Sequence, residues 1–273
     1  MIELKRMEKT RPKIGLVLGS GGVRGYAHIG AIKKLEENNI PINFISGASV
    51  GAMVGAYYAL FKDIHALEKL VLSSTWQEIF SLVDPSLSGG LIKGEKIEEF
   101  IDKNLEGADF SDLKIPFKVV ATDLNTGNAV EISEGKISEA VRASISVPVI
   151  FKPVLINGRY LIDGGLSNPV PVESVKNMGA DLVIAVNLIN NKSFDKKTFG
   201  KEKSFSAPKL VSLLYYNLAK NCLKGADFII EPEVKTKGII GMGHILKGEG
   251  KKMIFQGEKA VEILLPQIKK LII

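Results

Sequence analysis

Residues 45–57 read ISGASVGAMVGAY and carry the chain from a predicted strand into a predicted helix. The strand, over 42–47, is a short apolar run that ends at a glycine, and the helix covers 50–61. Within this helix every fourth residue from Gly51 to Ala59 is glycine or alanine. These small residues form one flat face, which lets the helix lie close to a sheet or to another helix.

A similar strand and helix precede this segment. KIGLVLG (13–19) is an apolar run closed by glycine, and the apolar spacing in 26–40 predicts a helix with charges on its opposite face. Two successive strand–helix units indicate a parallel sheet with right-handed crossovers. Further strands are expected at 117–124, 129–133, 181–188 and 226–234, and a hairpin turn is expected at Asn157-Gly158. The stretch 62–115 is expected to be mostly helical with a loop at 84–94, and further helices are expected at 137–146 and 253–272. The sequence therefore predicts an α/β fold.

The bulk composition is that of a folded protein of ordinary type. The chain has 273 residues, 45% hydrophobic and 24% charged, which suits one large α/β domain. Cys222 is the single cysteine, so no internal disulfide forms, and its apolar helical surroundings favour a core residue over a nucleophile. The N-terminus lacks the apolar segment of a secretory signal, and no apolar run reaches the ~18 residues of a transmembrane helix. We therefore expect a cytoplasmic protein.

The net charge of +6 comes almost entirely from lysine. Nucleic-acid readers use clustered arginines and aromatic platforms, and neither is present, so no nucleic-acid partner is expected. Attraction to anionic membrane surfaces is one explanation of the excess lysine, and solubility is the other.

Ser49 lies in GASVG, a Gly-x-Ser-x-Gly pattern between the predicted strand and helix. This pattern is typical of a nucleophile elbow, in which a tight, strained turn exposes a serine hydroxyl at a helix N-terminus. Gly47 and Gly51 allow the strand and the helix to approach there, and the helix dipole favours an anionic intermediate. The alternative is a serine that only caps the helix.

A glycine-rich turn follows the first strand, in GLVLGSGGVRGYAHIG (15–30). Such a loop leaves backbone N–H groups free to bind an anion. A phosphate cradle is one possibility, but the dinucleotide pattern needs glycine where Arg24 stands, and the Gly-Lys-Ser/Thr ending of a P-loop is absent. An oxyanion hole fits better, because two neighbouring strand–helix turns would supply both the donors and the nucleophile.

Asp163 ends a short predicted strand in YLIDGGLSNPVP (160–171). The two glycines after it allow close approach to another loop. An ordinary Asp-Gly turn is the alternative interpretation.

Taken together, GSGGVRG, GASVG and DGG, in this order, resemble the patatin-like phospholipase family, of the bacterial type related to the catalytic domain of neuropathy target esterase. VRASISVPVIFKPV (141–154) also looks like the family segment before its DGG. The resemblance covers residues 14–190, whereas 191–273 matches weakly. We expect a single domain over 1–273.

The resemblance implies a three-layer α/β/α fold with a mostly parallel central sheet. It also implies that the protein is a serine acyl hydrolase, which cleaves phospholipid or lysophospholipid esters without metal or cofactor. It implies Ser49 as nucleophile, Asp163 as base, and an oxyanion hole from the N–H groups of Gly21 and Gly22. Ser20 stands where the family often has glycine, which matters little because backbone donors carry the role. The supporting motif residues are Gly19, Ser20, Arg24, Gly25, Gly47, Gly51, Gly164 and Gly165.

Two other functions stay open. A triad of Ser49, Asp163 and His244 would follow the chain order of α/β-hydrolases, although those enzymes place the elbow after more strands. A non-catalytic nucleotide-binding module would use the glycine-rich turn and leave Ser49 inert. Of the remaining histidines, His28 is expected to pack in its helix and His65 to lie at the surface.

Three further features have alternative readings. Arg24 either steers an anionic head group, supports the oxyanion loop or forms an ion pair. The segment 73–94, with Trp76, could line an acyl pocket or lid, or be an ordinary core helix. The lysine-rich segment 190–209 is expected to be a loop, either a solvated linker or a contact with anionic lipid.

Overall fold

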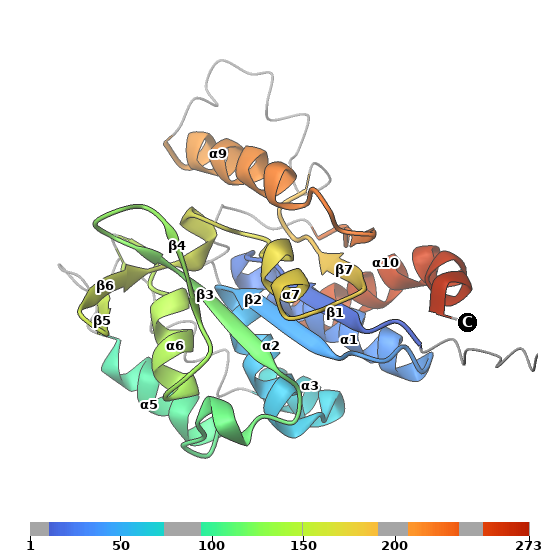
Figure 1. Ribbon diagram of the computed structural model, residues 1–273, viewed down its shortest axis with the longest axis horizontal. Coiled ribbons are helices and arrows are strands. Elements are labelled where there is room, and N and C mark those ends of the chain that lie inside the picture. Colours follow the sequence, from blue (N-terminus) through green and yellow to red (C-terminus); the bar gives the residue numbers. More distant parts are fainter. Residues whose placement is uncertain (1–10, 74–93, 149, 191–206, 235–247, 273) are drawn as a thin grey trace, which may run out of the picture.

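The computed structural model describes residues 11–73, 94–148, 150–190, 207–234 and 248–272, with only the backbone course given for 207–212 (Figure 1). The strands are β1 (Ile14–Leu18), β2 (Phe44–Ala48), β3 (Phe117–Asp123), β4 (Ala129–Ile132), β5 (Val154–Ile156), β6 (Arg159–Ile162), β7 (Leu182–Val186) and β8 (Phe228–Ile230). The α-helices are α1 (Tyr26–Glu37), α2 (Val50–Phe61), α3 (Ile64–Val71), α5 (Glu95–Asn104), α6 (Ile137–Ser144), α7 (Val172–Asn177), α9 (Ala207–Cys222) and α10 (Glu249–Ile272). Three 3-10 helices, η1 (Gly22–Gly25), η3 (Phe110–Asp112) and η4 (Gly164–Leu166), complete these elements.

The strands form one sheet in the order β5-β6-β3-β2-β1-β7-β8, with β4 also paired to β3. Strands β1, β2, β3, β7 and β8 pair in parallel, whereas the pairings of β3 with β4, of β3 with β6 and of β5 with β6 are antiparallel. The predicted hairpin at Asn157-Gly158 is confirmed, since β5 and β6 pair antiparallel. At the β5–β6 turn, Asn157 (φ 49°) and Gly158 (φ 75°) both take the left-handed conformation that an Asn-Gly turn provides.

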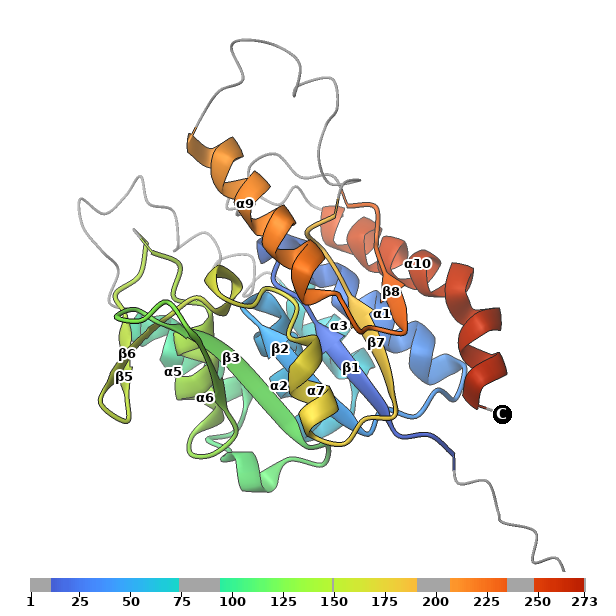
Figure 2. The same ribbon diagram turned by 45° about the horizontal axis from the view of Figure 1, so that its top comes forward.

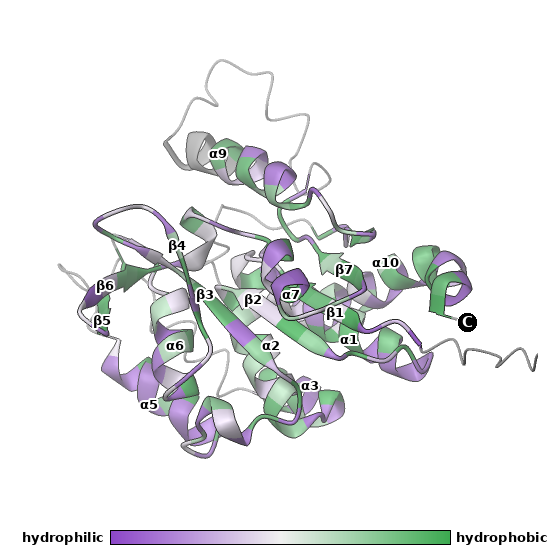
Figure 3. Cartoon of the chain, in the orientation of Figure 1, coloured by the Kyte–Doolittle hydropathy of each residue, from purple (hydrophilic) through white to green (hydrophobic). Residues whose placement is uncertain are grey.

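The helices cover both faces of this sheet and make the three predicted layers (Figures 1 and 2). On β1, which is wholly buried, Leu16 and Leu18 belong to the larger core with α1, α2, α3, α5, α6 and α10. Val17 points to the opposite face and joins the smaller core with α7 and α9. Because both faces of β1 and β7 are covered, these two strands carry no polar side chain, whereas Ser46 in β2 and Lys118 in β3 interrupt the apolar runs there (Figure 3).

The glycine-rich loop after β1 lies where the strand order reverses. From β1 the chain goes to β2 and β3 on one side, and later to β7 and β8 on the other. In open α/β sheets, ligands bind at the carboxyl ends of the strands at such a switch point.

The small-residue face of α2 lies against the sheet, as predicted. A Cβ atom at Gly51 would overlap the carbonyl oxygen of Leu18 in β1. A Cβ at Gly55 would lie 2.8 Å from the Phe117 ring in β3. Glycine is therefore needed at both positions for the helix to reach the strand ends.

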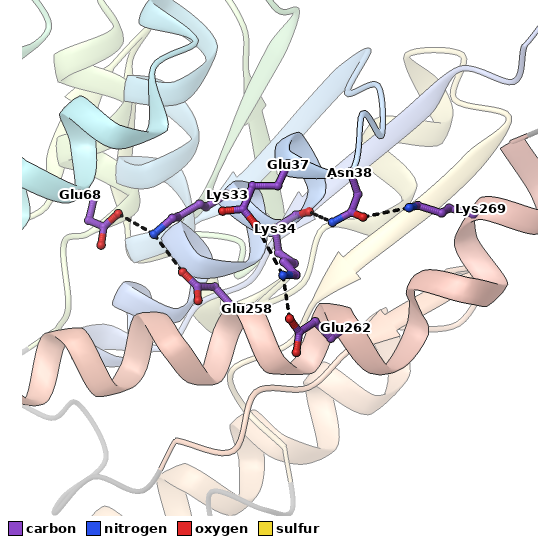
Figure 4. Close-up of polar contacts among 8 residues, drawn as sticks. All are labelled: Lys33, Lys34, Glu37, Asn38, Glu68, Glu258, Glu262 and Lys269. Atoms are coloured by element: carbon purple, nitrogen blue, oxygen red, sulfur yellow. Dashed lines mark hydrogen bonds and ion pairs between the residues drawn. The ribbon is translucent and has the colours of Figure 1, made fainter.

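Helix α10 packs along α1 over much of its length (Figures 1 and 2). Gly257 makes the crossing close, since a Cβ there would overlap the carbonyl oxygen of Ala27. Polar contacts lie along the crossing (Figure 4): Lys33 Nζ with Glu258 (3.1 Å), Lys34 Nζ with Glu262 (2.7 Å) and Lys269 Nζ with Asn38 (2.9 Å). Lys33 Nζ also contacts Glu68 of α3 at 3.2 Å. The segment after residue 190, which carries no recognisable motif, thus contributes a helix to the larger core.

The predicted loop over 190–209 is wrong at its C-terminal end. Asn190 is buried, and its amide donates to the carbonyls of Asn187 (3.0 Å) and Pro232 (3.2 Å). Residues 207–209 begin α9. The rest of this segment, and Trp76 with most of 73–94, lie outside the described residues.

Within the described ranges, every helix is too short or too polar to cross a membrane. Cys222 is half-buried against the smaller core, as expected, and burial raises the pKa of its thiol. A thiol with a raised pKa is a poor nucleophile.

Candidate active site

Ser49 occupies the turn between β2 and α2 in a strained backbone conformation. Its φ of 55° and ψ of −125° are unusual for a residue with a side chain, and such residues cost about 1–3 kcal/mol each. The side chain makes no capping hydrogen bond to the helix. The helix-cap alternative is therefore wrong, and the predicted elbow geometry is present.

The hydroxyl of Ser49 points at Asp163 instead. Ser49 Oγ donates a hydrogen bond of 2.7 Å to Asp163 Oδ2, and both residues are buried. The second carboxylate oxygen, Oδ1, accepts from the N–H of Gly165 at 2.8 Å. The structure thus brings together the two residues that the elbow and DGG motifs predicted.

Asp163 has no ion-pair partner among the described residues. Burial raises the pKa of its carboxyl to about 6, although the hydrogen bonds from Ser49 and Gly165 oppose the rise. A carboxyl group that titrates near 6 is a better proton acceptor at neutral pH than one at the ordinary value of ~3.9.

The segment at the end of α6 holds the backbone of both residues. The N–H of Ser49 donates to Ser144 Oγ (2.8 Å), which donates in turn to the carbonyl of Val120. The N–H of Asp163 donates to the carbonyl of Ser146 at 3.0 Å. Sequence reasoning missed Ser144, because a serine inside a helix gives no local sign of a distant partner.

The glycine-rich loop is fixed by its neighbours. The N–H of Ser20 donates to the carbonyl of Pro169 (2.8 Å), just after the DGG motif. Buried His28 donates from Nε2 to the carbonyl of Gly19 at 2.7 Å. Arg24 donates from Nε to the carbonyl of Gly21 at 3.0 Å. The interpretation of Arg24 as a support for this loop is the one that the hydrogen bond favours.

The contact from Arg24 also determines where the N–H of Gly22 points. The carbonyl of Gly21 and the N–H of Gly22 belong to one planar trans peptide, so they point in opposite directions. Holding the carbonyl therefore aims the N–H away from Arg24. Within the described residues, the N–H groups of Gly21 and Gly22 donate no hydrogen bond to the protein.

The other motif glycines permit close contacts around the serine. A Cβ at Gly25 would overlap Val50, which follows Ser49, and one at Gly47 would lie 2.5 Å from the carbonyl oxygen of Gly51. A Cβ at Gly164 would overlap the carbonyl oxygen of Val120 in β3.

Of the three histidines, two are described and neither contacts the serine. His28 is fully buried and burial lowers its pKa to about 4, so the imidazole is neutral at physiological pH. His65 is exposed on α3, as expected. His244 lies outside the described residues.

An apolar pocket begins beside the glycine-rich loop and runs between α1, α2 and α3. The space between these helices, counted together with the open solvent at its mouth, is about 380 Å³. Its lining consists of Gly22, Val23, Gly25, Tyr26, Ile29, Val50, Met53, Val54, Leu67 and Val71. Because Gly22 and Val50 flank the two turns of the site, the pocket opens next to the proposed oxyanion donors and Ser49. The sequence offered 73–94 as either a lining of such a pocket or a core helix, and most of that segment lies outside the described residues.

Among the described residues, no group of three or more His, Cys, Asp or Glu side chains is arranged to hold a metal ion.

Comparisons with known proteins agree with this geometry. Residues 16–176 match the family model described as patatin-like phospholipase. An uncharacterized NTE family protein of Mycobacterium bovis is 40% identical over 180 residues, which are 66% of this chain and 50% of that protein. The lysophospholipase nte1 of Emericella nidulans is 33% identical over 181 residues, 64% of this chain but 12% of that protein. The chain thus spans half or less of the length of these curated relatives.

Solved structures show the same fold at low sequence identity. VipD from Legionella pneumophila superposes with a TM-score of 0.58 at 17% identity, covering 94% of this chain and 67% of that one. The type III effector ExoU gives a TM-score of 0.50 at 16% identity, with 94% and 53% covered. The matched region, 16–176, contains the glycine-rich loop, the elbow and the DGG motif in order, and so the chain belongs to the patatin-like phospholipase family.

Proposed function

We propose that this protein is a serine acyl hydrolase that cleaves carboxyl esters of lipids by a Ser49–Asp163 dyad. The observation that carries the proposal is the 2.7 Å hydrogen bond between Ser49 Oγ and Asp163 Oδ2 in a buried site. The family and the relatives named lysophospholipase support a phospholipid or lysophospholipid ester as substrate.

In the first half of the reaction, Asp163 accepts the hydroxyl proton while Ser49 Oγ bonds to the ester carbonyl carbon. The carbonyl oxygen becomes an oxyanion, which the N–H groups of Gly21 and Gly22 stabilise. The intermediate then collapses, the bond to the leaving alcohol breaks, and Asp163 returns the proton to that alcohol. The acyl group stays on Ser49.

In the second half, water replaces the alcohol. Asp163 accepts a proton from water as the water oxygen attacks the acyl carbonyl, and a second oxyanion forms in the same place. Collapse releases the fatty acid, and the proton returns from Asp163 to Ser49 Oγ. The enzyme is restored without metal or cofactor.

The direct contact between Ser49 and Asp163 supports a dyad over a triad. In a Ser-His-Asp triad the imidazole lies between the other two side chains. Here the hydroxyl and the carboxylate are already hydrogen-bonded, so an imidazole has no place between them. The triad with His244 would require this pair to separate.

The apolar pocket indicates how the substrate would lie in the site. We assign the acyl chain to the space between α1, α2 and α3, because its lining is almost wholly apolar and it opens beside Gly22 and Val50. The head group then lies toward solvent. Peripheral contact with anionic membrane, for which residues 190–209 were suggested, remains a prediction, as does a single functional domain over 1–273.

A fluorophosphonate probe tests the proposal most directly, because it labels activated serines. Labelling of the folded protein that disappears in Ser49→Ala, together with release of fatty acid from lysophosphatidylcholine, is the expected result. Absence of both, combined with tight nucleotide binding, would favour the nucleotide-binding module instead.

A further inference from the structure

Tyr215 lies on the inward face of α9, beyond the region that matches the family model. Ala219 and Leu223 follow it at helical spacing and belong to the smaller core, and Tyr215 packs against the same core. Helix α9 lies on the side of the sheet that also carries α7 (Figures 1 and 2). Its inward face is therefore anchored at its C-terminal end and directed at the loops above the sheet.

The ring of Tyr215 reaches the DGG motif. A Cβ atom at Gly165 would lie 2.9 Å from Tyr215 Cε1, 2.9 Å from Asp163 Oδ1 and 2.7 Å from Ser20 Oγ. The ring edge, the carboxylate oxygen and the hydroxyl thus border the same small volume, which only glycine leaves unfilled. Asp163 Oδ2 accepts from Ser49, and Oδ1 accepts from the N–H of Gly165, beside the space that the Tyr215 ring edge also borders.

We propose that Tyr215 is a positioning residue that covers Asp163 on the side of α9 and keeps water away from its carboxylate. The inference rests on the proposed dyad and deepens it. It assigns a part in catalysis to a helix in which the sequence shows no motif.

The groups around Asp163 explain why such a cover matters. From the turn between β2 and α2, Ser49 donates to the carboxylate, and from η4 the Gly165 N–H does the same. From β3, Thr122 donates to the backbone carbonyl of Asp163 at 2.8 Å. No charged side chain among the described residues pairs with the carboxylate. No cation there therefore opposes the rise in the Asp163 pKa that exclusion of water causes.

Tyr215 itself adds no charge to the site. Burial, followed by the charge of Asp163, raises the pKa of its phenol, so the side chain is neutral at physiological pH. A neutral ring acts on Asp163 by displacing water. Its effect should therefore depend on the ring and not on the hydroxyl.

The test is the pH dependence of kcat/KM for a soluble ester in the full chain. Activity requires ionised Asp163, so it rises with pH, with a midpoint near 6 in the wild type. In Tyr215→Ala, water reaches the carboxylate, and we expect the midpoint to fall by ~1 pH unit toward the ordinary aspartate value. Tyr215→Phe, which keeps the ring, should restore the wild-type midpoint. Leu214→Ala, at an exposed neighbour on α9, is the control and should leave the profile unchanged.

Two results would overturn the proposal. One is an unchanged midpoint in folded Tyr215→Ala. The other is a loss of activity in Tyr215→Phe as large as in Tyr215→Ala, which would assign the effect to the hydroxyl. If Tyr215→Ala does not fold, Tyr215→Leu opens the same space with a good helix former and is judged in the same way.

A second measurement separates this proposal from the proposed function. Carbon-13 NMR of labelled aspartate, with the Asp163 signal identified from Asp163→Asn, follows the carboxyl titration without any turnover. A lower midpoint in Tyr215→Ala than in the wild type supports the cover even if no ester is hydrolysed. Equal midpoints overturn it even if the enzyme is active.

Discussion

Ser49 Oγ and Asp163 Oδ2 lie 2.7 Å apart although the two residues are 114 positions apart in the chain. Each side chain is set by its own loop at the carboxyl edge of the sheet. Ser49 follows β2, and Asp163 follows β6, which pairs with β3. Since β3 is the neighbour of β2, the sheet itself brings the two loops together.

Asp163→Asn should abolish ester hydrolysis, because an amide cannot accept the serine proton. The loss in kcat should be ~10³-fold or more, as for removal of a catalytic base in other serine hydrolases. His244→Ala should keep most of the activity. Steady-state kinetics with both variants checks this, and the reverse pattern would favour the triad.

The same Asp163→Asn variant should be more stable than the wild type at pH 8. The folded-state pKa of about 6 exceeds the ordinary value of 3.8, so the folded protein holds its proton more tightly than the unfolded chain. Stability therefore falls as pH rises from about 4 to 6, and above this range the ionised carboxylate costs about 3 kcal/mol.

Denaturant unfolding of Asp163→Asn at pH 8 and pH 4 measures this difference. The gain in free energy of unfolding should be present at pH 8 and fade toward pH 4. Ser49→Ala is the matched control, since it removes the nucleophile but retains the buried carboxylate, and it should show no gain. A gain of equal size at both pH values would contradict the assigned cause.

Arg24→Met should lower kcat more than it raises KM. Without the Nε–H, the Gly21 carbonyl keeps only the longer bond from the backbone N–H of Arg24 (3.3 Å), so the Gly21–Gly22 peptide is held less firmly and the Gly22 N–H is less well aimed at the oxyanion. Loss of one such donor typically lowers kcat by ~10²–10³-fold, because the interaction acts in the transition state.

A neutral short-chain ester and lysophosphatidylcholine should be compared for Arg24→Met. A similar fall in kcat for both substrates is expected if Arg24 holds the loop. A raised KM for the phosphate-bearing substrate alone would instead assign Arg24 to head-group binding.

Gly22→Ala should impair catalysis beyond its effect on folding. Gly22 has φ of 57°, so alanine is strained there and should destabilise the fold by about 1 kcal/mol. Gly158→Ala is the control, because Gly158 has a φ of 75° in the open β5–β6 turn and alanine there is similarly strained but lies away from the catalytic residues.

Thermal unfolding and kcat of the two glycine variants are compared side by side. Similar melting temperatures with a ~10²-fold lower kcat for Gly22→Ala alone are expected. Equal kcat values would remove Gly22 from the oxyanion hole.

Val54→Phe should shorten the acyl chains that the enzyme accepts. Val54 lines the apolar pocket, and a larger ring would fill part of it. Esters with long acyl chains should lose ~10-fold or more in kcat/KM, whereas butyrate esters should be little affected. A chain-length series of p-nitrophenyl esters measures this, with Leu271→Phe on the exposed face of α10 as the control. A uniform loss across the series would place the acyl chain elsewhere.

Much of the fold follows from local pattern in the sequence. The strands β1, β2, β3 and β7 were predicted within a residue or two, because each contains a short apolar run that is buried in the sheet. The helix α2 was predicted at its observed bounds, and a hairpin turn was predicted at Asn157-Gly158, where the structure has one. In each case the residues that determine the element lie inside it.

Part of the candidate site can likewise be predicted from the sequence, and part of it cannot. Ser49, Asp163 and the glycine-rich loop are visible in the sequence, because nucleophile, base and donors each need a tight turn that glycine marks. Three other features are not visible in the sequence, because they join distant or structurally separate groups. They are the contact of Ser144 with Ser49, the hydrogen bond from Arg24 to the Gly21 carbonyl, and the apolar pocket.

Tyr215 shows most clearly what the tertiary structure alone decided. Its helical spacing with Ala219 and Leu223 indicates an inward face, but nothing in the sequence says that this face meets Gly165. The sequence determined which residues carry reactive groups and which turns they occupy. Burial, the direction of each hydrogen bond and the raised pKa of Asp163 arise only when segments far apart in the chain pack together and exclude water.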